Sequence, residues 1–221
     1  MPQEIRAKVK KMMRATSSHR LLMCALAFVA NQATAAVPPA PKLPADAYFL
    51  MDATTGQVLV NHNGDLSLPP ASLTKIMTSY VLAEEVDAGR ASLDDMIKVS
   101  RNAWSQNPIF NGSSLMWIEP GKPVSLADLE RGVVISSGND ASVAVAEHLA
   151  GTESSFVDVM NQLAAELGLD NTVYRNPHGL PHPEHRTTAR DLATLSVALI
   201  NGHPEHYKIY KEQSFTYNGI K

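Results

Sequence analysis

A serine and a lysine three residues apart are the first residues of this sequence that could do covalent chemistry. Ser72 and Lys75 stand in the stretch PPASLTKIMTSYVLA, where an apolar stripe with helical spacing begins. At positions i and i+3 of a helix, two side chains lie on one face and can touch. A lysine can accept a proton from a serine hydroxyl only after burial or a nearby cation has lowered its pKa. The spacing thus fits a serine nucleophile, Ser72, with Lys75 as its base.

The same tetrapeptide also fits an ordinary helix start. Ser72 would then be an N-cap and Lys75 a solvated surface cation. Two points argue against the simple cap. A capping box has Glu or Gln in the place of Lys75, and a cation there faces the positive end of the helix dipole. That dipole and the free N–H groups could instead stabilise an oxyanion forming at the serine. The tetrapeptide alone leaves both interpretations open.

A second candidate lies 65 residues later, in the stretch ISSGNDAS. Ser137 and Asn139 stand between two expected helices, and Gly138 allows a tight turn there. Asn139 or Asp140 could also be present only to cap the following helix. The pattern Ser-x-Asn occurs again at residues 105–107, so it is weak by itself. Its occurrence together with Ser-x-x-Lys favours one composite site.

The first 35 residues are typical of a secretory signal peptide. A basic stretch precedes the apolar run LLMCALAFVA at residues 21–30, and the small residues Ala33 and Ala35 follow it. The apolar run is too short for an ordinary transmembrane helix. We therefore expect residues 1–35 to be a signal peptide and the rest to be exported, without lipid attachment at Cys24.

Beyond residue 35 the chain carries 13 basic and 21 acidic residues, a net charge of −8. This charge argues against binding to nucleic acid or to an anionic lipid surface. Cys24 is the only cysteine, so the exported part can form no internal disulfide. Residues 36–47 are Pro-rich and predict an extended leader, and residues 48–221 are long enough for one domain with its own core.

The remaining pattern predicts a hairpin followed mostly by helices. Two apolar runs, at 48–51 and 58–60, flank DATTG, where Gly56 can supply a positive φ. Helices are expected at 72–85, 125–135, 140–151, 154–167 and 188–200. Residues 214–221 begin like another strand. A two-stranded sheet is not stable alone, so we expect the sheet to be incomplete in this chain.

Seven segments, in order, are similar to the D-alanyl-D-alanine carboxypeptidases, the low-molecular-mass penicillin-binding proteins of the S11 serine peptidase type. They are FLMDATTGQVL, PPASLTKIMTSYV, FNGSSLMWIEPG, LERGVVISSGNDASVAVAEHLAG, ELGLDNTVYRNPHGL, TARDLATLSVALI and FTYNGIK. Ser-x-x-K and the second Ser motif belong to the set shared by penicillin-binding proteins and class A β-lactamases. The resemblance covers about residues 48–221. It implies an α+β, β-lactamase/transpeptidase-like fold: an antiparallel sheet flanked by helices, plus a helical subdomain. Residues 48–221 would be the N-terminal part of the penicillin-binding domain.

The resemblance also implies a role for each motif residue. Ser72 would attack the terminal D-Ala-D-Ala bond of a peptidoglycan stem pentapeptide, or a β-lactam such as penicillin, and form an acyl-enzyme. Lys75 would be the base and Ser137 would relay a proton to the leaving D-alanine. The Asn139 amide would hold Lys75 or the substrate backbone, and the Ser72 N–H would supply half of the oxyanion hole. The resemblance implies no metal and no cofactor, and it implies a periplasmic protein, at the outer face of the inner membrane in a full-length form. The sequence does not indicate an oligomeric state.

Two other residues of the resembling segments receive plainer interpretations. His178, in NPHGL, is interpreted as a turn histidine. Asp191 is interpreted as serving the start of its own helix.

One departure limits the expected activity. The family's third motif, Lys-Thr-Gly or Lys-Ser-Gly, which binds the substrate's terminal carboxylate, does not occur in the sequence. We therefore expect these 221 residues to be poorly active, and a truncated, non-catalytic penicillin- or cell-wall-binding module stays open.

A class A β-lactamase is the third possibility. That class needs a deacylating glutamate, and ELGLDN, starting at Glu166, is a near match. We interpret this stretch instead as a helix end with Gly168 as its stop.

Overall fold

The computed structural model describes residues 39–220, so the expected signal peptide lies outside the described residues. Residues from Pro44 onward form one compact unit. The described residues before Tyr48 form no helix or strand. Among the described residues, no helix is long and apolar enough to cross a bilayer.

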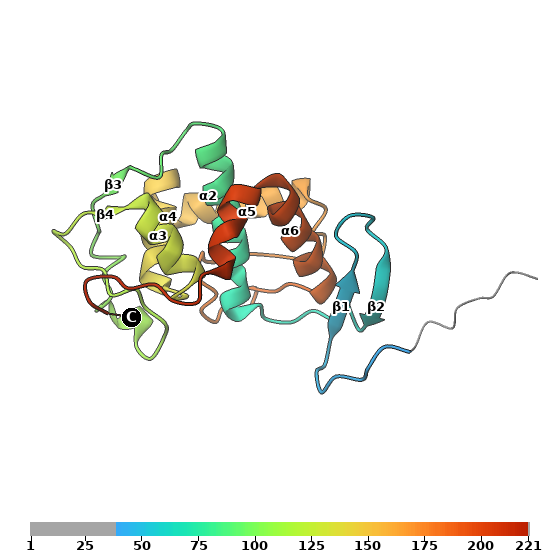
Figure 1. Ribbon diagram of the computed structural model, residues 1–221. Coiled ribbons are helices and arrows are strands. Elements are labelled where there is room, and N and C mark those ends of the chain that lie inside the picture. The colour runs from blue at the N-terminus through green and yellow to red at the C-terminus, as the bar shows by residue number, and fades with distance from the viewer. Residues whose placement is uncertain (1–38, 221) are drawn as a thin grey trace, which may run out of the picture. The chain divides into compact units, whose positions relative to one another are not determined.

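The compact unit begins with the predicted hairpin. Strands β1 (Tyr48–Met51) and β2 (Val58–His62) pair antiparallel, with Tyr48 opposite His62 and a bulge between Leu50 and Met51. In the turn, Gly56 has a φ of +72°, and the carboxylate of Asp52 accepts the N–H groups of the two following threonines. The hairpin prediction is confirmed, and helix α6 (Ala189–Gly202) packs against β1 (Figure 1).

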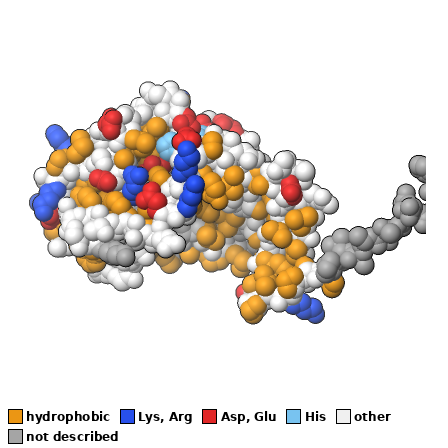
Figure 2. Space-filling model, viewed as in Figure 1, with side chains coloured by type: hydrophobic (Ala, Val, Ile, Leu, Met, Phe, Trp, Pro, Cys, Tyr) orange, Lys and Arg blue, Asp and Glu red, His pale blue; other side chains and the backbone are white. Residues whose placement is uncertain are grey.

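This hairpin exposes apolar side chains on both of its faces. Leu50, Val58 and Leu59 are each about half exposed, and Figure 2 shows hydrophobic side chains gathered over this part of the unit. Exposed apolar patches mark surfaces that normally pack against something. The hairpin thus has the character of part of a larger sheet, as the sequence predicts.

Helix α2 (Lys75–Asp87) lies at the centre of the unit and positions the first motif. It follows the short 3₁₀ helix η1 (Ala71–Thr74) and contacts α3 (Leu126–Val134), α4 (Asn139–Ala150), α5 (Glu153–Glu166) and α6 (Figure 1). Its core residues Met77, Val81 and Leu82 are almost completely buried. A helix surrounded on most sides needs apolar residues beyond a single stripe, which explains its composition.

Three helices begin with the side-chain caps that the sequence favours. The hydroxyl oxygens of Ser125, Thr152 and Thr188 accept N–H groups of α3, α5 and α6. Helix α4 is different, because its N-cap is Gly138 and no side chain caps it. The expectation that Asn139 or Asp140 caps this helix is therefore wrong. The Asn139 side chain contacts Lys75, and of the four N–H groups that the Asp140 carboxylate accepts only that of Ala141 belongs to α4.

The long segment between α2 and α3 is held by a second small sheet, formed by β3 (Met96–Ile97) and β4 (Val124–Ser125), and contains the 3₁₀ helix η2 (Pro108–Phe110). Phe110, Met116 and Ile118 from this segment are buried in the core. The segment is therefore ordered by its apolar side chains and contributes to the site.

The chain continues from α6 through α7 (Pro204–Tyr207) and the 3₁₀ helix η3 (Lys208–Lys211). The strand predicted from residue 214 is wrong for the described residues 214–220, which form only an isolated bridge between Tyr217 and Ile220. A strand needs a neighbour for its N–H and C=O groups, and here the segment pairs with no other described strand. Phe215 and Tyr217 instead stack and pack against the core.

Candidate active site

The serine and lysine of the first motif lie on two different elements. Ser72 is in η1 with its side chain exposed, and Lys75 is the first residue of α2 and only 5% exposed. The Lys75 Nζ lies 3.4 Å from the Ser72 Oγ, so the predicted contact exists. Ser72 caps no helix, since neither η1 nor α2 has a side-chain cap bond. The interpretation as an N-cap serine with a surface lysine is therefore wrong.

A strained turn presents Ser72. Pro70 precedes η1, and Ala71 has a φ of +47°, which is unusual for a residue with a Cβ. The loop bearing Gly179 passes so close that a Cβ at this position would lie 1.8 Å from the Ala71 carbonyl oxygen. Gly179 also has a φ of +90°, so only glycine fits there.

The amine of Lys75 has two strong acceptors. Nζ donates to the Asn139 Oδ1 at 2.7 Å and to the His178 carbonyl oxygen at 2.7 Å. A neutral amine has two N–H groups and one lone pair, so the lone pair is left for the Ser72 hydroxyl. Contacts between nucleophile and base are often long without substrate, which accounts for the 3.4 Å separation.

Burial increases the fraction of the Lys75 amine that is neutral near physiological pH. It lowers the pKa of Lys75 to about 8, and the charge of Asp140 acts in the opposite direction. With that pKa, about one tenth of the amine is neutral at pH 7. Lys75 therefore has both the geometry and the ionisation that a general base for Ser72 requires.

The second motif is on the loop between α3 and α4. Ser137 is partly buried with a φ of +52°, and Asn139 is buried at the start of α4. The backbone fixes this loop, because the Gly138 N–H donates to Gly132 and the Asn139 N–H donates to Ser114, both at 2.9 Å. The structure thus brings Asn139 into contact with Lys75 and places Ser137 two residues away. Among residues 39–220, no hydrogen-bond partner takes the Ser137 hydroxyl.

Asp140, which sequence reasoning assigned to capping, is a buried clamp. Its carboxylate accepts the N–H groups of Met116, Trp117, Ile118 and Ala141 at 2.8–3.1 Å. Burial raises the pKa of Asp140, and these N–H donors oppose that shift. The local sequence gave no sign of this role, because three of the donors come from a segment more than 20 residues earlier.

His178 contributes through its backbone. Asn176 shapes the turn, as its Oδ1 accepts the N–H groups of His178 and Gly179 and its Nδ2 donates to Leu180. Thr78 of α2 donates to the adjacent Pro177 carbonyl at 2.6 Å, which ties the turn to the helix. His178 therefore lies in a turn, as interpreted from sequence, and its carbonyl contact with Lys75 was not foreseen.

The His178 ring faces a carboxylate. Its Nε2 lies 3.5 Å from an oxygen of Glu153, and its Nδ1 accepts the Leu180 N–H. This arrangement places the ring proton on Nε2 and fixes the ring. Among the described residues, no group of His, Cys, Asp and Glu is placed to hold a metal ion.

Two other acidic residues that the sequence analysis considered, Asp191 and Glu166, contact neither Ser72 nor Lys75. The Asp191 N–H donates to Thr188 at the start of α6, as expected, and the Asp191 carboxylate accepts from Thr172 and Asn171. Glu166 ends α5, where it is exposed and accepts from Gln162. Its interpretation as a helix end is confirmed, since Gly168 follows with a φ of +70°.

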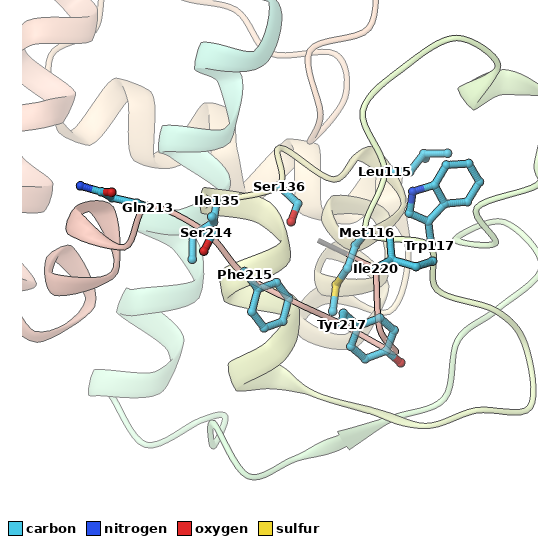
Figure 3. Close-up of a pocket in the computed structure, with 10 residues that line it drawn as sticks. All are labelled: Leu115, Met116, Trp117, Ile135, Ser136, Gln213, Ser214, Phe215, Tyr217 and Ile220. Atoms are coloured by element: carbon cyan, nitrogen blue, oxygen red, sulfur yellow. The ribbon is translucent and has the colours of Figure 1, made fainter.

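Two cavities flank these motifs. One, of about 310 Å³, is lined by Met116, Trp117, Ser136 and the C-terminal residues Phe215 and Tyr217, among others (Figure 3). The other, of about 500 Å³, is lined by residues 69–71 and 179–183, which precede Ser72 and follow His178. The linings adjoin the two motifs in sequence, at Ser136 and at Ala71, but include none of the four candidate site residues.

Comparison with known proteins identifies the family. A family model for Peptidase S11, described as D-alanyl-D-alanine carboxypeptidase, matches residues 31–221. The chain belongs to this family. The chain is 47% identical over 208 residues to the D-alanyl-D-alanine carboxypeptidase DacC of Escherichia coli strain K12. This alignment covers 94% of the chain and 51% of the relative. The chain is 44% identical over 209 residues to DacD of the same strain, covering 91% of this chain and 54% of the relative. The chain therefore spans about half the length of these curated relatives.

Solved structures of penicillin-binding proteins match the fold. Penicillin-binding protein 6B from Escherichia coli aligns with a TM-score of 0.80 and 47% identity, over 83% of this chain and 58% of that one. Penicillin-binding protein 5 from Haemophilus influenzae aligns with a TM-score of 0.81 and 44% identity, over 83% and 53%. The predicted β-lactamase/transpeptidase-like α+β class is confirmed, with helices and small antiparallel sheets in the described part.

Proposed function

We propose that this S11 chain carries the nucleophile, base and proton relay of a D-Ala-D-Ala carboxypeptidase, which removes the terminal D-alanine from peptidoglycan stem pentapeptides. One observation carries the proposal: the buried amine of Lys75 lies 2.7 Å from the Asn139 Oδ1 and from the His178 carbonyl oxygen, and 3.4 Å from the Ser72 Oγ. In its neutral form the amine can donate to the first two and accept the Ser72 proton with its lone pair. The relatives named D-alanyl-D-alanine carboxypeptidases support the reaction and the substrate.

In the first half of the reaction Ser72 acquires the acyl group. Lys75 accepts the hydroxyl proton, and the Ser72 oxygen attacks the carbonyl carbon between the two D-alanines. The negative oxygen that forms is stabilised by the Ser72 N–H, which has no backbone acceptor among residues 39–220. Lys75 then returns a proton, through the Ser137 hydroxyl, to the leaving nitrogen. The C–N bond breaks and D-alanine departs.

The second half releases the shortened peptide. Water attacks the ester carbon, and the neutral Lys75 amine takes the water proton. The C–O bond to Ser72 breaks, and the serine hydroxyl is restored by that proton. β-Lactams react in the first half instead, because Ser72 attacks their strained amide carbonyl and the ring C–N bond opens to give an acyl-enzyme. Penicillin-binding protein D2 from Listeria monocytogenes, which is 28% identical to this chain, has been solved in an ampicillin-bound form.

The missing Lys-Thr-Gly motif makes slow turnover the expected behaviour of these 221 residues. Without a group for the terminal carboxylate, substrate is held less well in the reacting position. A binding module that is acylated or occupied without turnover is the competing function, and the same absence favours it. We further propose that residues 1–35 direct the protein to the periplasm, with cleavage near Ala35.

A labelling experiment tests the proposal and separates it from the competing function. The purified protein is incubated with a fluorescent penicillin and run on a denaturing gel. Two variants are treated in the same way: Ser72→Ala, and Ser105→Ala as the control in which a different serine is replaced. We expect covalent label on the wild type and the control, and none on Ser72→Ala. Label that survives Ser72→Ala would contradict the nucleophile assignment. Slow release of D-alanine from a D-Ala-D-Ala pentapeptide supports the enzyme, and label without any release supports the binding module.

A further inference from the structure

The short helix that carries Ser72 is held by few contacts. Of the four residues of η1 only Thr74 is buried, whereas Ser72 and its neighbour Leu73 are exposed. Ala71 has a φ of +47°, a conformation that persists only where the surrounding structure enforces it. A buried contact must therefore hold this turn in place.

Thr74 has a polar partner from a distant part of the chain. Its Oγ1 lies 2.9 Å from the Nε2 of His185, at a sequence separation of 111 residues. Thr74 is completely buried and His185 is only 4% exposed, so solvent does not compete with this contact. Within residues 39–220, η1 makes one other side-chain hydrogen bond, between Ser72 and Lys75. The contact with His185 is thus the one that ties η1 to a different segment.

The hydrogen bonds of the His185 ring fix the position of its proton. Nδ1 accepts the backbone N–H of Arg175 at 3.4 Å, so a neutral ring carries its proton on Nε2. Nε2 then donates to the Thr74 oxygen. Burial, reinforced by nearby basic groups, lowers the pKa of His185 to about 4. The ring is therefore neutral at neutral pH and keeps this tautomer.

The segment around His185 is itself firmly held. The next residue, Arg186, exchanges two backbone hydrogen bonds with Val173. The buried ring of Tyr174 packs edge-on against the His185 ring, with centroids 5.7 Å apart. The imidazole thus projects from a fixed frame, and only the Thr74 side of the contact belongs to the short turn.

Thr74 stands between the two residues of the first motif. Its Oγ1 also lies against the neighbouring turn, where a Cβ on Gly179 would come within 2.9 Å. Lys75 is held by its own buried contacts, so a loss of the Thr74 hydrogen bond should displace η1 more than the lysine. The 3.4 Å separation between the Ser72 Oγ and the Lys75 Nζ therefore depends on this hydrogen bond.

We propose that His185 is a positioning residue of the Ser-Lys site: its neutral ring donates to Thr74 and so keeps the Ser72 oxygen within reach of the Lys75 amine. The inference deepens the proposed function and rests on it for the role of Ser72. The order of the turn itself can be measured whether or not the chain reacts with substrate.

Substitution of Thr74 tests the contact without removing the imidazole. Thr74→Val keeps the shape of the side chain and removes its hydroxyl, and Thr74→Ser retains the hydroxyl. Thr187→Val is the matched control, because Thr187 is also buried but its hydroxyl bonds to Thr172 and not to η1. The wild type and the three variants are acylated by fluorescent penicillin at a series of concentrations. The maximal rate, the half-saturating concentration and the final labelled fraction are measured.

We expect Thr74→Val to lower the maximal acylation rate by about 10–100-fold with an unchanged half-saturating concentration, because a misplaced serine reacts slowly with bound penicillin. Thr74→Ser should recover most of the rate, and Thr187→Val should keep it. A purely structural role would instead lower the labelled fraction and leave the rate of the folded molecules unchanged. Acylation of folded Thr74→Val at the wild-type rate overturns the inference.

Backbone ¹⁵N relaxation separates the inference from the proposed function. We expect the order parameters of the Ser72 and Leu73 amides to fall from about 0.85 toward about 0.6 in Thr74→Val and to stay unchanged in Thr187→Val. If the wild type is not acylated, the proposed function fails and these values decide the inference. Amides that loosen in Thr74→Val then support it, and amides that stay rigid overturn it.

A measurement on the wild type covers the case in which Thr74→Val does not fold. With ¹⁵N-labelled histidine, the His185 ring is assigned by correlation to its own backbone. It should carry its proton on Nε2 at neutral pH, and that proton should exchange slowly with water because Thr74 accepts it in the buried interior. A ring protonated on Nδ1 instead, or an Nε2 proton in fast exchange, overturns the inference.

Discussion

The Lys75 side chain is buried, and no carboxylate among the described residues contacts its amine. Its amine is surrounded by three oxygens that come from η1, α4 and the turn at His178. A lysine on a helix surface would keep its hydration and its charge, and it could not serve as a base near neutral pH. At the residue scale, then, chemistry depends on where the ammonium group is buried and on what surrounds it.

Lys75→Met should lower penicillin acylation by roughly 10²–10⁴-fold, because it removes the base and leaves the methylene packing nearly unchanged. Lys75→Arg should be equally inactive, since a guanidinium does not give up its proton. The measurement is the second-order labelling rate, with Lys98→Met, an exposed lysine, as the control. Acylation at the wild-type rate in Lys75→Met would remove Lys75 from the mechanism.

The acylation rate should rise with pH and level off above a midpoint near pH 8. The active form is the neutral amine, and burial lowers the pKa of Lys75 to about 8. The neutral fraction therefore increases through that pH and is small below pH 7. Labelling rates measured between pH 6 and 9.5, with the fold checked by circular dichroism, give the profile. A midpoint near the ordinary lysine value above pH 10 would contradict the burial argument.

Two turns, both dependent on glycine or proline, hold the elements that meet at the site. The turn at residues 176–180 and the turn before Ser72 touch at Gly179 and Ala71. Because the closest approach is between backbones, no side-chain adjustment can relieve a clash there. The position of the His178 carbonyl on Lys75 therefore depends on a missing Cβ.

Gly179→Ala should destabilise the fold by about 1–3 kcal/mol and also reduce acylation, because the turn must move away from η1. Gly168→Ala is the control: Gly168 has a similar positive φ, but its Cβ would meet nothing within 4 Å. That variant should lose only about 1 kcal/mol and keep its labelling rate. Thermal unfolding and gel labelling measure both effects. Equal labelling rates in the two variants would disprove the link between this contact and catalysis.

The elements were predictable where local rules decide them, and the site was predictable only in part. Ser125 and Thr188 start their helices as the pattern indicates, and the hairpin forms around Gly56. Asp140 was misassigned because its partners at 116–118 are brought close only by tertiary packing. A backbone carbonyl such as that of His178 leaves no trace in residue types, so its contact with Lys75 could not be foreseen.

Across the whole described unit, a second buried polar cluster joins distant helices. His203 contacts Asp87 and Glu84 of α2, and His206 contacts Glu130 of α3 at 2.5 Å. Both imidazoles are nearly completely buried. His203 directly precedes α7 and His206 lies within it, so the two contacts fasten the segment after α6 to α2 and α3. The cluster is separate from the site and serves stability.

His206 gives the whole unit a pH-dependent stability. The hydrogen bond to Glu130 raises the pKa of His206 above its ordinary value. A raised folded-state pKa adds stability that is fully present below about pH 6.5 and is lost as the pH rises through the folded value. His206→Gln should therefore lower the thermal midpoint more at pH 6 than at pH 8.5. His182→Gln, at an exposed position, should change neither, and equal losses for His206→Gln at both pH values would contradict the assignment.

The boundary between η1 and α2 separates an exposed part of the candidate site from a buried part. Lys75 is anchored on three sides inside the core, whereas Ser72 sits on an exposed turn next to Leu73, which is half exposed. A larger or polar side chain at Leu73 would therefore meet solvent, whereas at Thr74 or Lys75, both buried, it would meet the closely packed core. Within one short stretch, the residue beside the proposed nucleophile should thus tolerate substitution and the residues beside the proposed base should not.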